Sequence, residues 1–493
     1  MSYRFRWAYC QLEVLRQCLP SSVRHILDEL PETLDETYER ILKDIKKVNQ
    51  EHAIRLLHCL TVAIRPLRVK ELAEVLAVDF DAARREGIPK LNPDWRLADQ
   101  YQAVLSTCLS LIAIVDDGDS QVVQFSHFSV KEYLTSGRLA NANGAVSRYH
   151  ILPQSAHAIL AQACLGVILR FDNHVNINTA GDIPLAWYAA KHWVEHAQFE
   201  DVSSRIRDAM EYLFDEDKPH FAAWSHLELE PLLAPGWFWF TQFPNPHEGP
   251  LYCASRYGFY DLAKHLVIKH PEHVNARGGR MMSPLGAALY GEHLNVAELL
   301  YEHGADVHVR GRDEQTLLHM ASENGLVDRA RWLLNHGADA NALVKGGKAL
   351  LHLVAWFKRL EIVQMLLEYS ADIHARNARG EVALHLAACS WEWHDEPHHR
   401  VNLNILQFLL DHGADVNTKD NEGSIPLHHS SFRSKDSLYP LGRGTVEGTR
   451  LLLEHGANVD AENNKGDTPF LVALEAGHHE MVEFLWGLGT MLG

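Results

Sequence analysis

Residues 316–341 read TLLHMASENGLVDRARWLLNHGADAN, and the phrases of this stretch recur along the second half of the chain. The opening phrase returns as ALLHLVA at 349–355, VALHLAA at 382–388 and IPLHHSS at 425–431. The closing phrase returns as LLYEHGADVH at 299–308, LLDHGADVN at 409–417 and LLLEHGANVD at 451–460. Self-similarity with a period of about 33 residues is typical of stacked repeat architectures. We therefore expect a repeat array.

Each copy predicts two short helices. A Thr such as Thr316 caps the start of the first helix, and a Pro such as Pro426 is tolerated in the first turn. A Gly such as Gly304 or Gly413 follows the second helix, where a left-handed residue costs little. One copy cannot bury its Leu-Leu pair alone, so neighbouring copies must stack to form a core.

These residues resemble the ankyrin repeat, whose signature is Thr-Pro-Leu-His, two short helices and then Leu-Leu-x-x-Gly-Ala-Asp-x-Asn. The resemblance implies an α-solenoid of about seven repeats over residues 248–493, with a protein partner as its ligand. The predicted repeats are 250–283, 284–316, 317–349, 350–382, 383–425, 426–468 and 469–493. The fifth and sixth are longer than the others, which places insertions after Cys389 and after Ser431.

Residues 33–134 predict a small helical domain with a β-hairpin. Thr33 and Glu36 have the spacing of a capping box before a first helix. Residues 52–64 and 69–78 predict two further helices, and residues 109–127 read as strand, acidic turn and strand. Three helices followed by a hairpin is the order of a winged-helix domain.

Winged helices often bind DNA, but the charges argue against DNA binding by this one. The candidate recognition helix, Val69–Val78, carries one Lys against two Glu, and the turn of the hairpin holds Asp116, Asp117 and Asp119. Phosphate would be repelled from both. The net charge of the chain is −18, which also argues against a nucleic-acid partner. We expect a packing or hinge role for this domain.

The phrases LPETLDETYERIL, AIRPLRVKELAEVLAV and VVQFSHFSVKEYLTS resemble the segment between the nucleotide-binding NACHT domain and the ankyrin array of fungal STAND-type signalling proteins. The winged-helix piece is similar to one named after a glycosylphosphatidylinositol inositol-deacylase. The resemblance divides the first half into a helical tail that ends a NACHT domain (1–32), a winged-helix-like domain (33–140) and a helical linker domain (141–247).

The sequence departs from that family because it has no P-loop, the GxxxxGK motif followed by Ser or Thr that cradles phosphate. The nearest text, Lys345–Ala349, lies inside a predicted ankyrin turn. The chain is then a truncated product, a partial gene model or a relative without the NTPase. Nucleotide hydrolysis is not implied.

Catalytic motifs were sought in the sequence. It contains no GxSxG elbow, HExxH motif, GxGxxG after a strand, or Cys/His set with zinc spacing. We therefore predict a non-enzymatic protein with no cofactor and no small-molecule substrate. The loop Trp391–His399 holds His394, His398 and His399, which leaves open metal binding or a solvated loop.

The location of the protein is predicted from its cysteines and its N-terminus. The seven Cys are scattered, which fits a reducing compartment. The N-terminus carries early charges, unlike a signal peptide, and no apolar run is long enough to span a bilayer. We predict a cytoplasmic protein with no membrane partner.

The sequence contains 32 His residues, and this high content has two possible interpretations. The functional reading is metal or proton chemistry. The structural reading is hydrogen bonding in the turns and complementation of helix C-termini, and we favour it. The two groups concerned are those after Leu (His319, His352, His385, His428) and those before Gly (His303, His336, His412, His455).

Two surfaces are candidates for partner binding. The first is the row of projecting turns, which form a mildly basic edge: Arg277, Arg280, Arg310, Arg312, Lys345, Arg376 and Arg379. This edge either docks an acidic partner or is simply the charge that exposed turns usually carry. The second combines the insertions, which bring Trp391, Trp393 and Tyr439 side by side; tolerated loop growth is the alternative.

Residues 231–244 are rich in aromatic side chains. We expect Trp237, Phe238 and Trp239 to cover the first repeat and fasten it to the helical domain, with a membrane-dipping loop as the alternative. The sequence thus predicts a mainly α protein that binds a protein partner through ankyrin repeats. The alternative is the sensor portion of a STAND NTPase.

Overall fold

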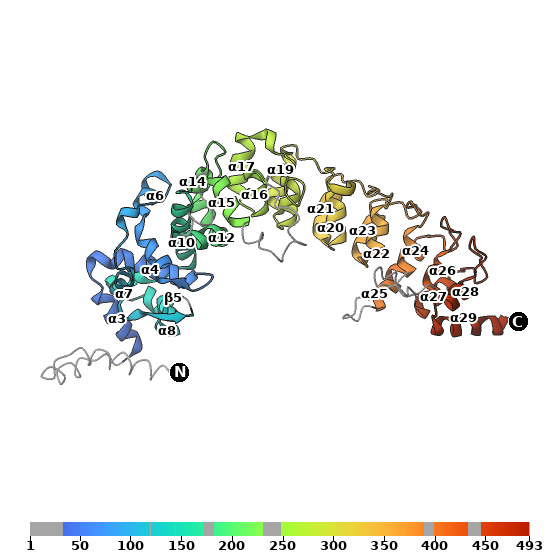
Figure 1. The fold of residues 1–493 in the computed structure, drawn as a ribbon, viewed down its shortest axis with the longest axis horizontal. Helices are drawn as coiled ribbons and strands as arrows, with labels where there is room; N and C mark the ends of the chain where they lie inside the picture. Colours follow the sequence, from blue (N-terminus) through green and yellow to red (C-terminus); the bar gives the residue numbers. More distant parts are fainter. Residues whose placement is uncertain are drawn as a thin grey trace. The chain divides into compact units, whose positions relative to one another are not determined.

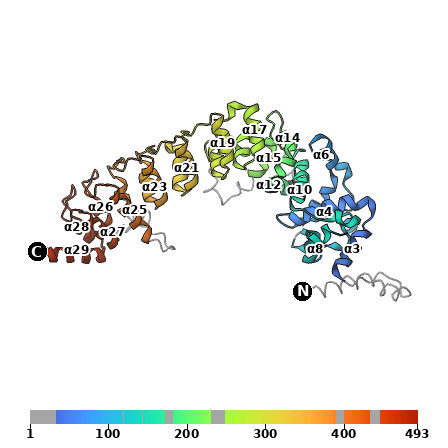
Figure 2. The ribbon, with the colours of Figure 1, turned by 180° about the vertical axis from the view of Figure 1, so that it is seen from behind.

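The computed structural model describes residues 33–118, 120–142, 144–171, 182–229, 248–388, 399–431 and 445–492. The chain divides into two compact units, Met1–Pro271 and Glu272–Gly493. Both are built mainly from helices (Figures 1 and 2). The boundary falls within the first predicted repeat, 250–283, so the two helices of that repeat belong to the first unit and its closing turn belongs to the second.

The first unit begins with helices around a small antiparallel sheet whose strand order is β1-β5-β4. The capping box predicted for α3 is present: the Thr33 hydroxyl accepts the Glu36 N–H at 3.2 Å, and the Glu36 carboxylate accepts the Thr33 N–H at 3.3 Å. The elements are α3 (Leu34–Asp44), α4 (Gln50–Val62), β1 (Leu67–Arg68), α5 (Val69–Glu74), β2 (Val78–Asp79), α6 (Phe80–Glu86), β3 (Lys90–Leu91), α7 (Gln100–Cys108), β4 (Ile112–Asp117), β5 (Ser120–Phe125), α8 (Phe128–Leu134) and α9 (Gly137–Ala140).

The assignment of Val69–Val78 as the recognition helix is wrong. Helix α5 ends at Glu74, a 3-10 turn follows, and the chain enters strand β2 at Val78. The helix that leads into the hairpin is α7, which contains no charged residue. The two Glu of α5 do not face a ligand, since Glu71 is 3% exposed and Glu74 is fully buried.

Two Arg residues explain why these carboxylates are buried. Arg65 donates to both oxygens of Glu71, at 2.8 and 2.7 Å, and this hydrogen bonding raises the pKa of Arg65. Arg96 donates from Nε to Glu74 at 3.0 Å. A buried charge is tolerated when it is paired and hydrogen-bonded, so α5 is a packing element of the domain core.

A helical layer follows and carries the first repeat. Its helices are α10 (Pro153–Ile168), α12 (Ala186–Ala197), α13 (Val202–Arg205), α14 (Arg207–Leu213) and α15 (His220–Leu229), and the repeat is α16 (Pro250–Arg256) with α17 (Tyr260–Lys269). The Trp193 ring stacks on Phe259 of the repeat at 5.8 Å and meets Trp224 edge-on at 5.4 Å. Gln198 donates to the Tyr257 carbonyl at 2.8 Å.

The predicted fasteners Trp237, Phe238 and Trp239 lie outside the described residues. Their prediction is therefore untested. Among the described residues, Trp193 and Trp224 contact the first repeat, and the sequence analysis did not single them out. Both are fully buried, and their ring contacts come from elements far apart in the chain.

The second unit is a stack of helix pairs. Its helices are α18 (Pro284–Tyr290), α19 (Leu294–Glu302), α20 (Leu317–Glu323), α21 (Val327–Asn335), α22 (Leu350–Trp356), α23 (Leu360–Glu368), α24 (Ala383–Ala388), α25 (His399–Asp411), α26 (Pro426–Ser431), α27 (Val446–Glu454), α28 (Pro469–Glu475) and α29 (His479–Leu492). The predicted left-handed Gly after the second helix is confirmed at Gly304 (φ +88°) and Gly413 (φ +90°). Leu299 and Leu300 illustrate the buried Leu pairs of the core.

Within the described part of the chain, no helix combines the length and the apolar composition needed to cross a membrane.

Candidate protein-interaction surface

The His after Leu ties its repeat to the next one at His352, His385 and His428, whereas the buried Nε2 of His319 has no hydrogen-bond partner among the described residues. The Nδ1 atom of His352 accepts the Ala349 N–H at 3.1 Å, and its Nε2 lies 2.9 Å from the Glu381 carbonyl of the following turn. His385 and His428 repeat the pattern, with Nε2 at 3.1 Å from the Ser424 carbonyl and 3.0 Å from the Asp467 carbonyl. A backbone N–H must donate, so Nδ1 is the unprotonated nitrogen and Nε2–H donates onward.

The His before Gly has a different role. Nδ1 lies 2.7 Å from the carbonyl four residues earlier in His303 and in His336, 2.8 Å in His412 and 2.9 Å in His455. Each of these carbonyls also accepts the backbone N–H of the same His, at 3.1–3.3 Å, so the ring approaches a carbonyl in the last turn of the helix. The structural reading of the two His groups is therefore confirmed.

Asn side chains add a second link between turns. Asn341 donates to the Ser370 carbonyl at 3.2 Å and accepts the Asp372 N–H at 2.7 Å. Asn275 and Asn417 bond their following repeats in the same way. The projecting turns are thus held in a fixed register along the second unit.

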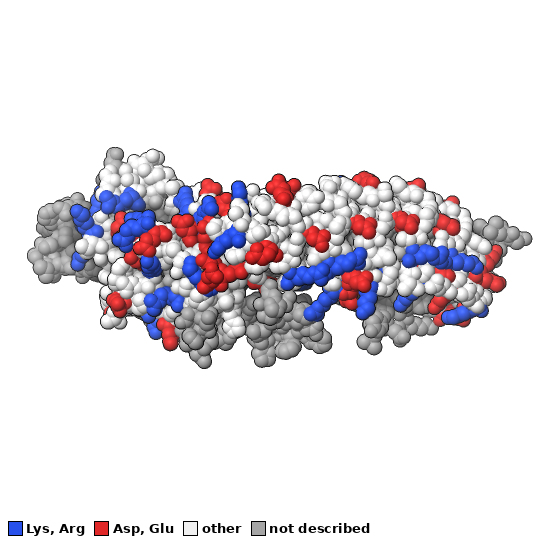
Figure 3. Space-filling model, turned by 90° about the horizontal axis from the view of Figure 1, so that it is seen from above, with Lys and Arg blue, Asp and Glu red and all other residues white. Residues whose placement is uncertain are grey.

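All seven cationic side chains predicted in the basic edge are exposed. Arg310 donates to the Leu343 carbonyl at 3.1 Å, and Arg376 donates to the Lys419 carbonyl. Within the described residues, Arg277, Arg280, Lys345 and Arg379 make no side-chain hydrogen bond or ion pair. Figure 3 shows Lys and Arg side chains drawn out lengthwise along the second unit, among scattered Asp and Glu.

The sequence analysis missed Lys419, which belongs to the same row. Its Nζ donates to the Glu462 carbonyl at 3.1 Å, as Arg376 does to Lys419 itself. Asp420 and Glu422 in the same turn had hidden it, because the summed charge of that turn is negative. A comparison of equivalent positions, instead of summed charge, would have found it.

The second predicted surface is not described. Trp391 and Trp393 lie in residues 389–398 and Tyr439 lies in residues 432–444, outside the described residues. His394 and His398 also fall there, so the predicted choice between a metal site and a solvated loop stays open.

One cluster has ligand atoms close enough for a metal ion. In the second unit, single ligand atoms of His385, Asp420 and His429 lie within 4.8 Å of one another. However, His385 Nε2 carries the proton that it donates to Ser424, because its Nδ1 accepts the Val382 N–H. It therefore offers no lone pair to a metal, and the cluster does not fit one.

The same cluster shifts two pKa values. Burial and the neighbouring His429 lower the pKa of His385 to about 4. Burial alone would raise the pKa of Asp420, but hydrogen bonds from His429 and the Ser424 N–H outweigh it, so the pKa is lowered. The Asp420 carboxylate accepts from His429 at 2.9 Å. The cluster stabilises the turn that ends the fifth predicted repeat.

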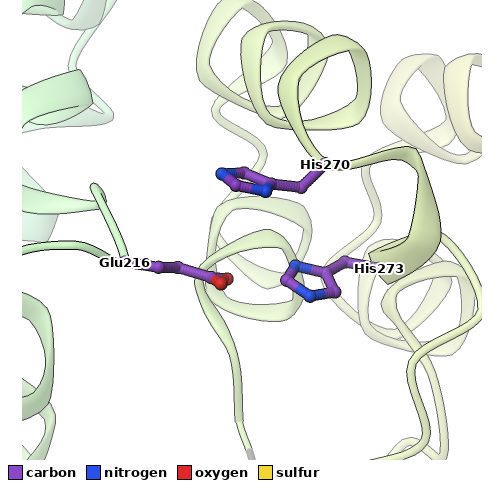
Figure 4. Close-up of side chains that lie close together, drawn as sticks. All are labelled: Glu216, His270 and His273. Atoms are coloured by element: carbon purple, nitrogen blue, oxygen red, sulfur yellow. The ribbon is translucent and has the colours of Figure 1, made fainter.

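In the first unit, Glu216 follows α14 and His270 ends α17, and a carboxylate oxygen of one lies within 4.8 Å of a ring nitrogen of the other (Figure 4). His273, the third labelled side chain, belongs to the second unit. Glu216 and His270 by themselves are fewer than the three or four ligands that proteins provide for zinc.

Known proteins share both halves of this architecture. The family model for ankyrin repeats matches residues 251–344, 285–377, 351–441 and 402–490, and the model for the winged helix domain of GPI inositol-deacylase matches residues 34–147. The protein "Azaphilone pigments biosynthesis cluster protein L" of Monascus ruber is 30% identical over 292 residues, which cover 55% of this chain and 59% of that protein. The chain thus matches about three fifths of the relative's length.

The predicted fold class is confirmed: the chain is mainly α, with a winged-helix domain followed by ankyrin repeats. Ankyrin repeats are a non-catalytic, protein-binding architecture, because their stacked turns and helices create an extended binding surface.

Proposed function

We propose that this protein is a non-enzymatic scaffold that binds a protein partner through its ankyrin repeats. The observation that supports the proposal is the row of exposed cationic turns on a rigid stack. Hydrogen bonds join each turn to the next, so the exposed side chains keep a fixed spacing. Surface charge on a fixed frame favours specificity and fast association.

The proposal is tested by affinity capture from an extract with the full chain. The test variant carries Arg277→Glu, Arg280→Glu and Lys345→Glu, three exposed positions whose side chains have no partner in the part of the chain that the structure describes. The control variant carries Arg331→Glu, an exposed position on the second helix α21. A protein retained by the native chain and by the control, but lost from the test variant, supports the proposal. If nothing is retained by the native chain, the scaffold function is wrong.

We propose a cytoplasmic location for this scaffold. Among the described residues, Cys59, Cys108 and Cys164 are free thiols and are buried, which suits a reducing compartment. Burial raises the pKa of the Cys59 thiol to about 12, so that thiol is inert.

The alternative function is the sensor portion of a STAND-type NTPase. The order of a GPI-inositol-deacylase-type winged helix and ankyrin repeats favours it, because the resembling phrases occupy the same order in that family. Sequencing transcripts upstream of Met1 tests this alternative. An in-frame P-loop would support it, and a stop codon directly upstream would contradict it.

The relative's name suggests where to look first for a partner. It is named for a pigment biosynthesis cluster, so we propose that proteins encoded beside the gene for this chain are the first candidates. Pairwise binding assays against those neighbours, with the Arg331→Glu control above, test this choice.

A further inference from the structure

One position in the projecting turns forms a continuous row along the second unit. It is the second residue after the Asn, His or Asp that closes each repeat. We call this row the turn track, and its members are Arg277, Arg310, Leu343, Arg376, Lys419 and Glu462. The track therefore presents cations, then an apolar side chain, then cations again, and it ends on an acid.

Three of the cations are held in place by main-chain carbonyls of the next track position. Arg310 donates to Leu343 at 3.1 Å, Arg376 donates to Lys419, and Lys419 donates to Glu462 at 3.1 Å. A long, flexible side chain loses much conformational entropy when it is fixed. Here the fold has already fixed these side chains, so a ligand does not have to order them.

The anchoring carbonyls are neutral and do not compensate the positive charges, although Glu314 in the same turn partly compensates Arg310. The Arg310 guanidinium is 3.8 Å from the Glu314 carboxylate, at the far limit of an ion pair. Within the described residues, Arg376 and Lys419 form no ion pair. A cation that is ordered but not neutralised is suited to bind a carboxylate from outside.

The middle of the track is apolar. Leu343 stands between Arg310 and Arg376 and is 46% exposed. Its equivalents on both sides are basic, so its exposure interrupts the charge pattern at one repeat. A complementary ligand needs an apolar group at that point and acidic groups on both sides.

We propose that the turn track binds an extended, acidic peptide segment that carries an apolar residue between its carboxylates. Packed helices lie about 8–10 Å apart, and an extended chain advances about 3.3 Å per residue. The carboxylates and the apolar residue are therefore spaced by about three residues. This inference rests on the proposed scaffold function and names the chemistry of its partner.

A nucleic acid would offer anionic charge too, but it fits the track poorly. The track ends at Glu462, and Asp313 and Glu314 directly follow Arg312 in one of its turns. A phosphate backbone presents a uniform charge, so it would meet these acids and would leave Leu343 without an apolar partner.

The test measures fluorescence anisotropy of a labelled synthetic peptide with the full chain. The peptide has a Glu at every third position on both sides of a central Leu, with Gly and Ser between them. We compare native protein with Arg310→Gln and Arg376→Gln, which keep an N–H donor for the carbonyl and remove the charge. Arg331→Gln, on helix α21, is the matched control.

The expected result is about tenfold weaker binding for the double variant Arg310→Gln/Arg376→Gln and unchanged binding for the control. Leu343→Ser, which removes no hydrogen bond, is expected to weaken binding severalfold. Added salt should weaken native binding more than it weakens binding to the double variant.

Three results would overturn the inference: equal binding of a peptide with its Glu residues made contiguous, unchanged affinity of the double variant, or tighter binding of a single-stranded oligonucleotide. The experiments distinguish failure of the turn-track inference from failure of the proposed scaffold function. If a captured partner is retained by the double variant and the peptide does not bind, the scaffold stands and the turn track is not its docking site.

Discussion

Acidification should destabilise the second unit through its buried turn histidines, and His385 is the sharpest case. Its side chain is fully buried, with both ring nitrogens engaged by the main chain. Protonation of Nδ1 would abolish its acceptor role toward the Val382 N–H and place a cation in the core. Burial and His429 accordingly lower the pKa of His385 from 6.5 to about 4.

The size of the effect follows from linkage between protonation and folding. A lowered pKa means that the folded state binds fewer protons than the unfolded state below pH 6.5. The stabilisation is therefore complete above pH 6.5 and is lost as the pH falls toward 4. For His385 alone the loss is about 1 kcal/mol at pH 5.5 and about 2 kcal/mol at pH 5.0.

The assay compares urea-induced unfolding of the native chain and His385→Asn at pH 7.5 and pH 5.0. The Asn amide oxygen can still accept the Val382 N–H, so the variant keeps the helix cap and loses the titrating ring. The difference between the two pH dependences cancels the titrating groups that do not interact with His385. We expect native protein to lose about 2 kcal/mol more than the variant between the two pH values.

Equal pH dependence in native protein and variant would refute this reasoning. It would mean that His385 does not titrate across the unfolding transition, and that the hydrogen bonds at Val382 and Ser424 do not keep the ring neutral. The variant His352→Asn gives an independent check, because burial lowers the pKa of His352 too.

Other substitutions test how side-chain packing and backbone conformation contribute to stability. Gly286→Ala should destabilise the protein by about 2 kcal/mol net, because the new Cβ would lie 1.9 Å from the Met281 carbonyl oxygen. Gly487→Ala, where a new Cβ meets open space, should stabilise it by up to about 1 kcal/mol. Urea unfolding measures whether each variant gains or loses stability. Ser370→Gly should raise the free energy of unfolding by about 0.5–1 kcal/mol, because Ser370 adopts φ +62° at a position where other repeats have Gly. His308→Asn should stabilise by about 1 kcal/mol in the same assay, by adding the inter-repeat bonds that Asn341 makes. Trp193→Ala should cost about 3–5 kcal/mol and speed hydrogen exchange in residues 250–269.

Much of the second unit was predictable because its interactions recur at nearly constant sequence distances. His352 bonds a residue 29 positions on, and Asn341 reaches residues 29 and 31 positions on. In a stacked array each repeat contacts only its neighbours, so one period in the sequence describes most contacts. The turns, helix ends and His roles therefore followed from the pattern.

The first unit was less predictable because its decisive contacts are not periodic. Arg96 reaches Glu74 across 22 residues, and this pairing buries a carboxylate that sequence analysis placed on the surface. Helix α7 was missed, since QYQAVLSTC has no strong helical pattern. The prediction of the recognition helix was wrong because α7 was missed and because the Glu residues of α5 are buried.

By itself, the sequence determined the repeat period, the helix pairs, the basic character of the turns and the order of a winged helix before an array. Local propensity and period carry that information. Only the tertiary structure decided that Trp193 holds the first repeat, that Lys419 joins Arg376 in one row, and that neutral carbonyls anchor these cations. Each of these three findings depends on which groups, distant in the sequence, come within hydrogen-bonding or van der Waals distance when the helices pack. The charge and composition of the sequence do not specify those contacts.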